Sequence, residues 1–359
     1  MIRNTRFLPA LLLLPLLGLP ACGTEGEGGT PSPDAHRPAG GYADAPPVAP
    51  AEEAADAPFR APSFTYAGPV LDLPPEPGEG DAPAHETERD WAIAAGTVAW
   101  ARGQGLHALP VAEVVAILGT TFVGAPYEPG TLELPGPERL VVNLRTFDCV
   151  TFVEQVLVLA HLVRDAGVEA DAAPDSPQGQ AFRDRYRALL TELRYRDAAI
   201  DGYVSRLHYF TEWMDHAVAR GFAEDVTESL GGEVDPRPIH FMTSNAHAYR
   251  QLDEDPGLLP GIREVEARLS EGERRFLPQD RIRQAESGIR SGDIIAAVST
   301  LDGLDIAHTG FALLHQGRIH LLHAPLVGDS VEISERPLAE RIQGIQGQKG
   351  IRVLRPLDR

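Results

Sequence analysis

The feature that most constrains the fold is a long apolar run, from Cys149 to Val163, that begins directly after Asp148. Its large apolar side chains are spread around most of a helical circumference and do not form one stripe, which is typical of a helix buried on all sides. Hydrophobic residues make up 43% of the 359-residue chain, which is enough to build a core around such a helix. We therefore expect a central helix with Cys149 in its first turn.

A cysteine in the first turn of a helix can be chemically active. Unpaired backbone N–H groups and the positive end of the helix dipole favour the thiolate there, and the thiolate is the nucleophilic form. A free cysteine can equally be a small buried hydrophobe. Cys149 is therefore a candidate nucleophile if the chain supplies a base and a group that orients the base.

The N-terminus predicts export and a lipid anchor. Residues 1–21 combine a basic start, a short apolar segment and small residues before Cys22, so they resemble a bacterial lipoprotein signal whose Cys22 becomes lipid-modified. An ordinary secretory leader cut near Ala21 is the alternative reading. Cys22 and Cys149 are the only cysteines, so a disulfide framework is excluded.

Residues 22–84 are rich in Gly, Pro and Ala and poor in large apolar residues, which predicts a disordered tether. Gly23 lacks the Asp that marks inner-membrane retention in some bacteria, which favours an anchor on the periplasmic side of the outer membrane. The expected partners include the membrane, through this anchor. A formal net charge of −20 argues against nucleic acid as a partner. We expect no cofactor and no resident metal.

From residue 85 onward the sequence predicts an α+β fold in one domain, 85–359. Helices are expected at 88–103, 110–118, 149–163 and 182–193, and short β segments at 294–298, 308–315, 318–323, 331–333 and 351–354, with a helix at 338–343. Residues 195–285 are less periodic and are interpreted as a largely helical insertion. Within it we expect helices at 206–220, 246–252 and 261–269 and a short strand at 239–243. The N-terminal helical part should pack on a C-terminal antiparallel sheet.

The sheet also supplies candidate bases for the thiol. If Gln316 and Gly317 form a two-residue hairpin turn, Gly310 lies opposite His323 and Leu313 lies opposite His320. His308 and His323 then share one face of the sheet as diagonal neighbours, about 7–8 Å apart at the backbone, within reach of two imidazole rings. The glycine at position 310 leaves space beside them. Strand alternation therefore predicts His308 as the base and His323 as the residue that orients it.

Several short segments, in order along the chain, resemble the signature segments of the NlpC-type, papain-like cell-wall cysteine hydrolases. They are Gly124-Ala125-Pro126-Tyr127, Asp148-Cys149-Val150-Thr151-Phe152-Val153, Gly292-Asp293-Ile294-Ile295, His308-Thr309-Gly310-Phe311 and His323-Ala324-Pro325. Further segments are similar to the N-acetylmuramoyl-L-alanine amidase-like branch of that group. They are Thr131-Leu132-Glu133, Ser205-Arg206-Leu207-His208-Tyr209-Phe210, Met242-Thr243-Ser244 and Gly303-Leu304-Asp305-Ile306-Ala307-His308. Pro325 departs from the wider group, in which Ser is frequent at that position.

The resemblance implies a papain-like NlpC-type core and a peptidoglycan or soluble muropeptide substrate. The bond cleaved would be the amide between N-acetylmuramic acid and L-alanine. Carried over by position, Cys149 would be the nucleophile, His308 the base and His323 the third member. Tyr127 would donate its hydroxyl to the oxyanion together with the backbone N–H of Cys149.

The remaining matched positions are candidates for substrate binding. Arg206 suits a carboxylate, and Thr243 and Ser244 suit carboxylate or sugar hydroxyl groups. Asp148 could bind a polar substrate group, although an aspartate before an apolar run is more often the N-cap of the helix. An ordinary surface ion pair is the alternative for Arg206, and packing is the alternative for Tyr127.

Three other functions remain open at this point. A zinc amidase could use the several histidines near Asp305, although strand alternation turns His320 and His323 to opposite faces and there is no His-Glu-x-x-His run. A cysteine peptidase could instead cut the stem peptide at the D-glutamyl-diaminopimelate bond. The chain could also be a non-catalytic wall-binding lipoprotein.

Overall fold

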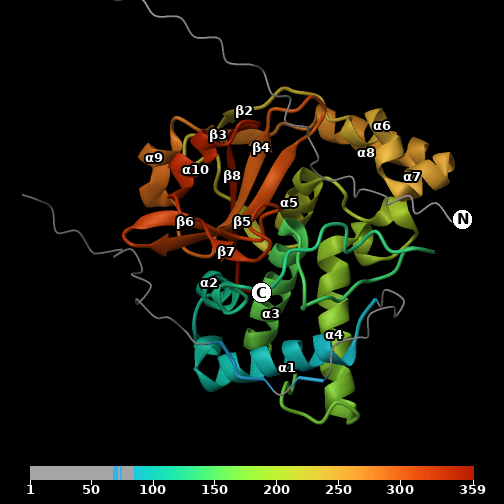
Figure 1. Ribbon diagram of the computed structural model, residues 1–359, viewed down its shortest axis with the longest axis vertical. Helices are drawn as coiled ribbons and strands as arrows, with labels where there is room; N and C mark the ends of the chain where they lie inside the picture. The colour runs from blue at the N-terminus through green and yellow to red at the C-terminus, as the bar shows by residue number, and fades with distance from the viewer. Residues whose placement is uncertain (1–67, 72, 75–84) are drawn as a thin grey trace, which may run out of the picture. The chain divides into compact units, whose positions relative to one another are not determined.

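The computed structural model describes residues 68–71, 73, 74 and 85–359 (Figure 1). The predicted signal peptide 1–21, the lipid-attachment residue Cys22 and nearly all of the tether 22–84 lie outside the described residues. Within the described part, no helix is both long and apolar enough to cross a membrane.

The predicted central helix is present as α3, Cys149–Arg164. All its residues except Val150 and Arg164 are buried, and it contacts α1 (Glu88–Gly103), α2 (Val111–Thr121), α4 (Pro177–Arg194) and β5 (Ile306–His315). Figure 1 shows α1 to α4 gathered on one side of the sheet, with α3 among them. Burial on all sides explains why its apolar residues do not form a single stripe.

Helix boundaries differ from the prediction where local capping decides them. Helix α4 begins at Pro177, five residues earlier than expected, because the Ser176 hydroxyl accepts the Gly179 N–H and Pro177 suits the first turn. Helix α5 covers only Phe210–Ala219, since Arg206 is extended after a 3₁₀ turn at Tyr203–Ser205. Helix period predicted these helices, whereas a side-chain cap sets the start of α4 and the extended backbone after a 3₁₀ turn sets the start of α5.

The C-terminal strands form an antiparallel meander, as predicted. It runs β4 (Ile294–Ser299), β5, β6 (Arg318–His323) and β7 (Glu332–Ile333), while β8 (Gln348–Pro356) returns to pair with β4 on its other side. Gln316 and Gly317 both have positive φ, and Leu313 pairs with His320, so the predicted hairpin register is confirmed. Helix α10 (Leu338–Gly344) packs against β6 and β8.

The insertion is largely helical, as predicted, but it also contributes three short strands that the sequence did not indicate. It contributes β1 (Ala223–Asp225), β2 (Glu233–Val234) and β3 (Arg275–Pro278), which extend the sheet beyond β8 in the order β2-β3-β8-β4-β5-β6-β7, with β1 also paired to β8. These strands are too short to show a period in the sequence.

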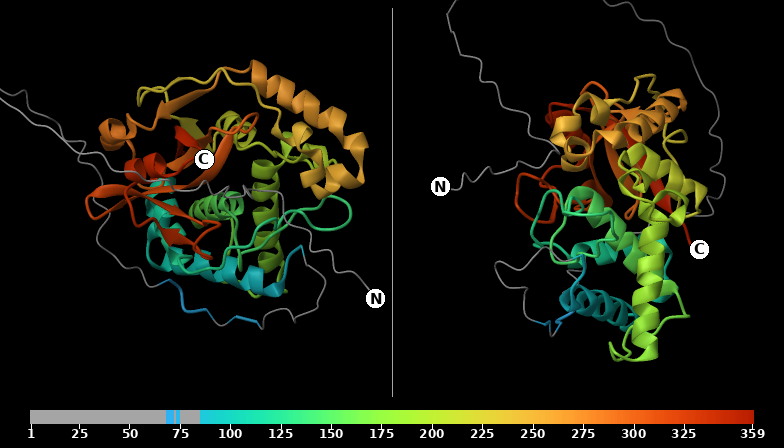
Figure 2. Two further views of the ribbon diagram at one scale, coloured as in Figure 1. Left: turned by 45° about the horizontal axis from the view of Figure 1, so that its top comes forward. Right: turned by 90° about the vertical axis from the view of Figure 1, so that its right-hand side faces the viewer.

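The strand expected at 239–243 is wrong. The N–H groups of His240 and Phe241 both bond the carbonyl of Gly303, and the chain turns into the short helix α6, Phe241–Ser244. Helices α7 (Arg250–Glu254) and α8 (Leu259–Glu271) follow (Figure 2). Buried apolar residues of these helices and of α6 belong to a small separate cluster. Contact with the β4–β5 turn, which the sequence does not reveal, decides this conformation.

Candidate active site

Asp148 is the N-cap of α3. Its carboxylate accepts the N–H groups of Val150 (3.0 Å) and Thr151 (2.8 Å), and the Thr151 hydroxyl accepts the Asp148 N–H (3.0 Å). This reciprocal capping box satisfies backbone N–H groups that would otherwise be unpaired at the start of the helix. Cys149, only 8% exposed, is thereby held in the first turn.

The thiol of Cys149 meets the start of strand β5. The ladder between β5 and β6 begins at Phe311, so the first residues of β5 pair only with β4. The backbone N–H of Thr309 is directed at the Cys149 sulfur, as are the N–H groups of Cys149 and Val150 at the helix start. Thr309 directly follows His308, so this contact brings the nucleophile helix to the strand that carries the candidate base. Within the described chain, the thiol forms no hydrogen bond with an imidazole ring.

His308 and His323 form a hydrogen-bonded pair. Nε2 of His308 lies 2.8 Å from Nδ1 of His323, and the two rings are nearly perpendicular. His323 is fully buried and His308 is partly buried. A Cβ at position 310 would come within 2.8 Å of the His323 Cβ and 2.6 Å of the Leu322 carbonyl oxygen, so only glycine fits between the strands here. The diagonal pairing expected from strand alternation is therefore the arrangement in the structure.

The backbone of Tyr127 is fixed on two sides, by the loop before β7 and by the segment that leads into α3. Its N–H donates to the Asp329 carbonyl (2.8 Å), and it forms a parallel bridge with Phe147, two residues before Cys149. Burial raises the pKa of the Tyr127 hydroxyl, and the nearby Cys149 and Asp148 raise it further. The hydroxyl therefore stays protonated and can donate a hydrogen bond.

Burial sets the resting protonation states of the Cys149 thiol and of the two imidazoles. Burial first and the Asp148 carboxylate second raise the pKa of Cys149 to about 12, against the three N–H groups that lower it. Burial and the positive charge of Arg341 lower the pKa of His308 to about 3. The N–H groups at the helix start lower the pKa of the thiol, as expected there, but burial and the Asp148 charge outweigh them. The site holds a neutral thiol and neutral imidazoles, so a thiol proton would have to move as the sulfur attacks.

Glu332 on β7 is a neighbour of the histidine pair that the sequence did not indicate. It lies opposite His323 in the β6–β7 register, and its Oε1 is 3.5 Å from His323 Nε2. Strand period predicted a β segment around Glu332, but the loop 324–331 before it has no regular pattern from which to derive the register.

Arg206 is part of the interior. It is 3% exposed, its guanidinium bonds the Glu133 carboxylate and the Leu132 carbonyl (2.9 Å), and Glu138 lies 3.6 Å away. Through these contacts Arg206 connects the insertion to the loop 131–138. Arg206 thus forms ion pairs, as the alternative reading expected, but they lie in the interior and not on the surface.

Thr243 and Ser244 also have partners within the insertion. The Thr243 N–H (3.0 Å) and hydroxyl both donate to Glu266, and the Ser244 hydroxyl lies 2.9 Å from His240 Nδ1. The structure therefore brings together Cys149, Tyr127 and the two histidines, whereas Arg206, Thr243 and Ser244 have other partners.

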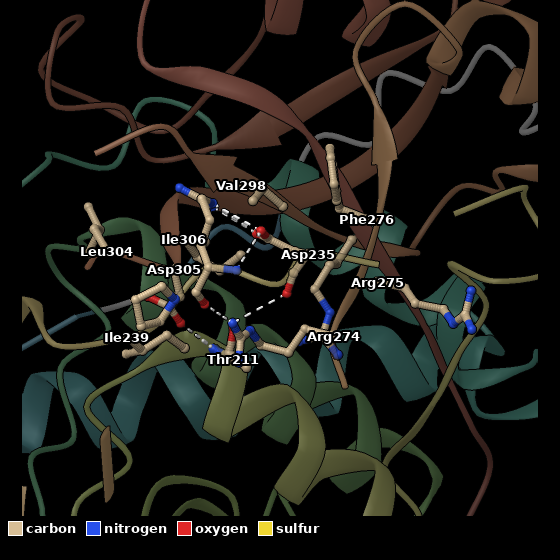
Figure 3. Close-up of a pocket in the computed structure, with 13 residues that line it drawn as sticks. Thr211, Asp235, Ile239, Arg274, Arg275, Phe276, Val298, Leu304, Asp305 and Ile306 are labelled. Atoms are coloured by element: carbon tan, nitrogen blue, oxygen red, sulfur yellow. Dashed lines mark hydrogen bonds and ion pairs between the residues drawn. The ribbon is translucent and has the colours of Figure 1, made fainter. Parts of the chain in front are cut away.

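A small cavity of about 20 Å³ lies beside the β4–β5 turn and is large enough for about one water molecule (Figure 3). On its wall the Asp305 carboxylate accepts the Thr211 N–H at the start of α5 (2.8 Å). This bond fixes the beginning of β5, three residues before His308. Across the described residues, no group of three His, Cys, Asp or Glu side chains is arranged to hold a metal ion.

Fold and site together define a class: an α+β protein with a cysteine at the start of a buried helix, placed against two neighbouring strands that carry a hydrogen-bonded histidine pair. The sequence matches the N-acetylmuramoyl-L-alanine amidase-like family, AmiA-like, over residues 117–351. The chain belongs to this family.

Solved structures agree with this assignment. An N-acetylmuramoyl-L-alanine amidase from Bacteroides uniformis shares 32% identity, with a TM-score of 0.61 over 69% of this chain and 99% of its own. A Bacteroides fragilis protein described only provisionally as a xylanase shares 34% identity, with a TM-score of 0.59 over 66% and 98%. A Legionella pneumophila protein at 19% identity, with a TM-score of 0.50 over 71% and 91%, shares the fold. No curated protein matches this chain.

Proposed function

We propose that this protein hydrolyses the amide between the lactyl group of N-acetylmuramic acid and L-alanine, with Cys149 as the nucleophile. The observation that carries the proposal is the hydrogen bond between His308 on β5 and His323 on β6, together with the N–H of Thr309, the residue after His308, at the Cys149 sulfur. Family membership and the Bacteroides uniformis amidase support the bond and the substrate class. The arrangement also supports an NlpC-type, papain-like core.

The proposed reaction starts from a neutral Cys149 thiol and a neutral His308 imidazole. His308 takes the thiol proton as the Cys149 sulfur attacks the lactyl carbonyl carbon, and the carbonyl electron pair moves to oxygen. The tetrahedral intermediate collapses, the C–N bond breaks, and His308 returns the proton to the amine of L-alanine. A thioester between Cys149 and the muramyl lactyl group remains. Water then attacks it with His308 as base, which releases the muramic carboxylate and restores the thiol.

Two donors are available for the oxyanion. The Cys149 N–H lies at the unpaired start of α3, and the Tyr127 hydroxyl stays protonated next to Cys149. Preorganised donors at this position stabilise the charge that develops only in the transition state. We assign Tyr127 this role. We assign Asp148 to the cap of α3, as its contacts support.

The substrate class places the protein in the cell envelope. Peptidoglycan or soluble muropeptides would be its substrate, with Cys22 carrying a lipid that anchors the protein to the periplasmic side of the outer membrane. Arg206 would shape the substrate-facing surface through the 131–138 loop that it holds, and Thr243 and the exposed Ser244 would bind carboxylate or sugar hydroxyl groups of the substrate.

Mass spectrometry of digested muropeptides tests this function. Wild type should release the intact stem peptide and a sugar with a free lactyl carboxylate, and Cys149→Ala should release neither. Cleavage within the stem peptide would replace the amidase by the peptidase reading. Activity that survives iodoacetamide but is lost with a chelator would indicate a metal enzyme. Wall binding without cleavage by wild type would indicate a non-catalytic protein.

A further inference from the structure

One nitrogen of the His323 ring has no hydrogen-bond partner among the described residues. Nδ1 of His323 is engaged by His308, and the ring is fully buried. Its other nitrogen, Nε2, is buried and has no hydrogen bond within the described chain, while the Glu332 carboxylate oxygen lies 3.5 Å away. A buried nitrogen must be either a donor or an acceptor, so its protonation matters for the whole pair.

The base assignment fixes where the protons must be. Nε2 of His308 faces His323, so Nδ1 is the nitrogen of His308 left to receive the thiol proton. In a neutral imidazole one nitrogen carries the proton and the other has the lone pair. His308 must then carry its proton on Nε2 and donate it to Nδ1 of His323. His323 in turn must carry its own proton on Nε2, where it points toward Glu332.

We propose that Glu332 is a positioning residue that accepts the Nε2–H of His323 and so sets the tautomers of both histidines. The proposal rests on the proposed function of Cys149 and His308. In the opposite arrangement, His323 carries its proton on Nδ1 and donates it to Nε2 of His308. His308 then carries its proton on Nδ1 and cannot act as the base.

The Glu332 side chain is 43% exposed, and the neighbours on its covered side hold the carboxylate beside His323. Glu332 stands directly opposite His323 in the β6–β7 ladder. Gly328 in the preceding loop has φ +131, and a Cβ at that position would come 3.2 Å from Glu332 Oε2. On the other side lies α10, whose Arg341 has a buried Nη1 without a partner and interacts electrostatically with Glu332.

Charge balance around the pair supports the same role. The charged or titratable groups that face His323 are His308 from β5, Arg341 from α10 and Glu332 from β7. Arg341 opposes a positive charge on either ring, whereas the Glu332 carboxylate favours the imidazolium that forms when His308 takes the thiol proton. Glu332 therefore offsets Arg341 at the moment of attack.

The tautomers can be measured directly by ¹⁵N NMR of the full chain labelled in histidine, with His308→Asn and His323→Asn to assign the signals. We expect both rings in the wild type to be neutral with the proton on Nε2. Glu332→Ala should shift His323 toward the Nδ1–H tautomer, and Glu332→Gln, whose amide oxygen can still accept, should restore Nε2–H. An Nδ1–H tautomer of His323 in the wild type, or no change in Glu332→Ala, would overturn the proposal.

Kinetics give the second readout. Glu332→Ala should lower kcat/KM by about 10–100-fold, by analogy with the loss when a partner that orients a metal-ligating histidine is removed. The loss should fall mainly on kcat, with an altered pH profile. Glu332→Gln should recover most of the loss, and Glu335→Ala, an exposed glutamate three residues further along, serves as the control. Equal activity of Glu332→Ala and wild type would contradict the role. If Cys149→Ala remains active, the proposed function fails, while the tautomer result still decides the role of Glu332.

Discussion

Asp148 has two separable physical effects, and a pair of substitutions distinguishes them. Its carboxylate caps α3 through three donors, the N–H groups of Val150 and Thr151 and the Thr151 hydroxyl. Its negative charge also raises the pKa of the adjacent Cys149 thiol. Asp148→Asn removes the charge and keeps a side chain that caps helices well, whereas Asp148→Ala removes both.

The capping effect sets the expected stabilities. Replacing a capping Asp by Ala costs about 1 kcal/mol, within a range of about 0.5–2 kcal/mol, and replacement by Asn costs little. For a domain of this size, 1 kcal/mol corresponds to about 2–4 °C in Tm. Urea unfolding and thermal melts should therefore show a lower free energy of unfolding and a lower Tm for Asp148→Ala. Both quantities should stay near the wild-type values for Asp148→Asn.

The charge effect is read from thiol reactivity. Both variants should lower the pKa of Cys149, so iodoacetamide should alkylate it faster than in wild type at pH 8. Each pKa unit corresponds to about a tenfold rise in thiolate well below the pKa. The reasoning is refuted if Asp148→Asn destabilises as much as Asp148→Ala, or if alkylation is unchanged in both. A raised KM in Asp148→Asn with unchanged stability would indicate substrate binding.

Three further predictions follow from the structure. Glu154→Leu or Arg194→Met should each lower the free energy of unfolding by about 3–5 kcal/mol, because each leaves one charge of an almost fully buried ion pair unpaired. The double variant should lose much less of this free energy, as measured by urea unfolding. Tyr127→Phe should lower kcat by about 10²–10³-fold, as loss of an oxyanion donor does, with Tm unchanged; an unchanged kcat would assign Tyr127 to packing. Folding lowers the pKa of His308 from 6.5 to about 3. Between pH 3 and pH 6.5 the unfolded chain therefore binds more protons than the folded chain. The free energy of unfolding should fall as the pH drops from 6.5 toward 3, by up to about 1.4 kcal/mol per pH unit. His308→Asn should flatten that slope in urea titrations, and an unchanged slope would contradict the lowered pKa.

The parts of the fold that repeat with a strong period could be predicted from the sequence. The buried helix at Cys149 and the β5–β6 hairpin both follow from side-chain spacing, and the two-residue turn fixed which histidines share a face. The strands of the insertion were missed, since segments of two to four residues carry no period and are held by the partner strand β8.

Within the site, residue types were easier to predict than environments. Spacing and resemblance led to Cys149, His308 and His323, but the burial that keeps the thiol neutral depends on tertiary packing. Glu332 was missed because the irregular loop before it hides its register with His323. The buried partners of Arg206 come from a loop about 70 residues earlier, a pairing that residue type alone does not predict.

The most direct test of the central proposal is the covalent intermediate. A muropeptide digest quenched with acid during turnover should yield protein carrying a muramyl group joined through its lactyl carbonyl, mapped by peptide mass spectrometry to Cys149 and absent from Cys149→Ala. Turnover by wild type without any adduct on Cys149, or an adduct that contains stem-peptide residues, would contradict cleavage of the muramyl–L-alanine amide by this thiol.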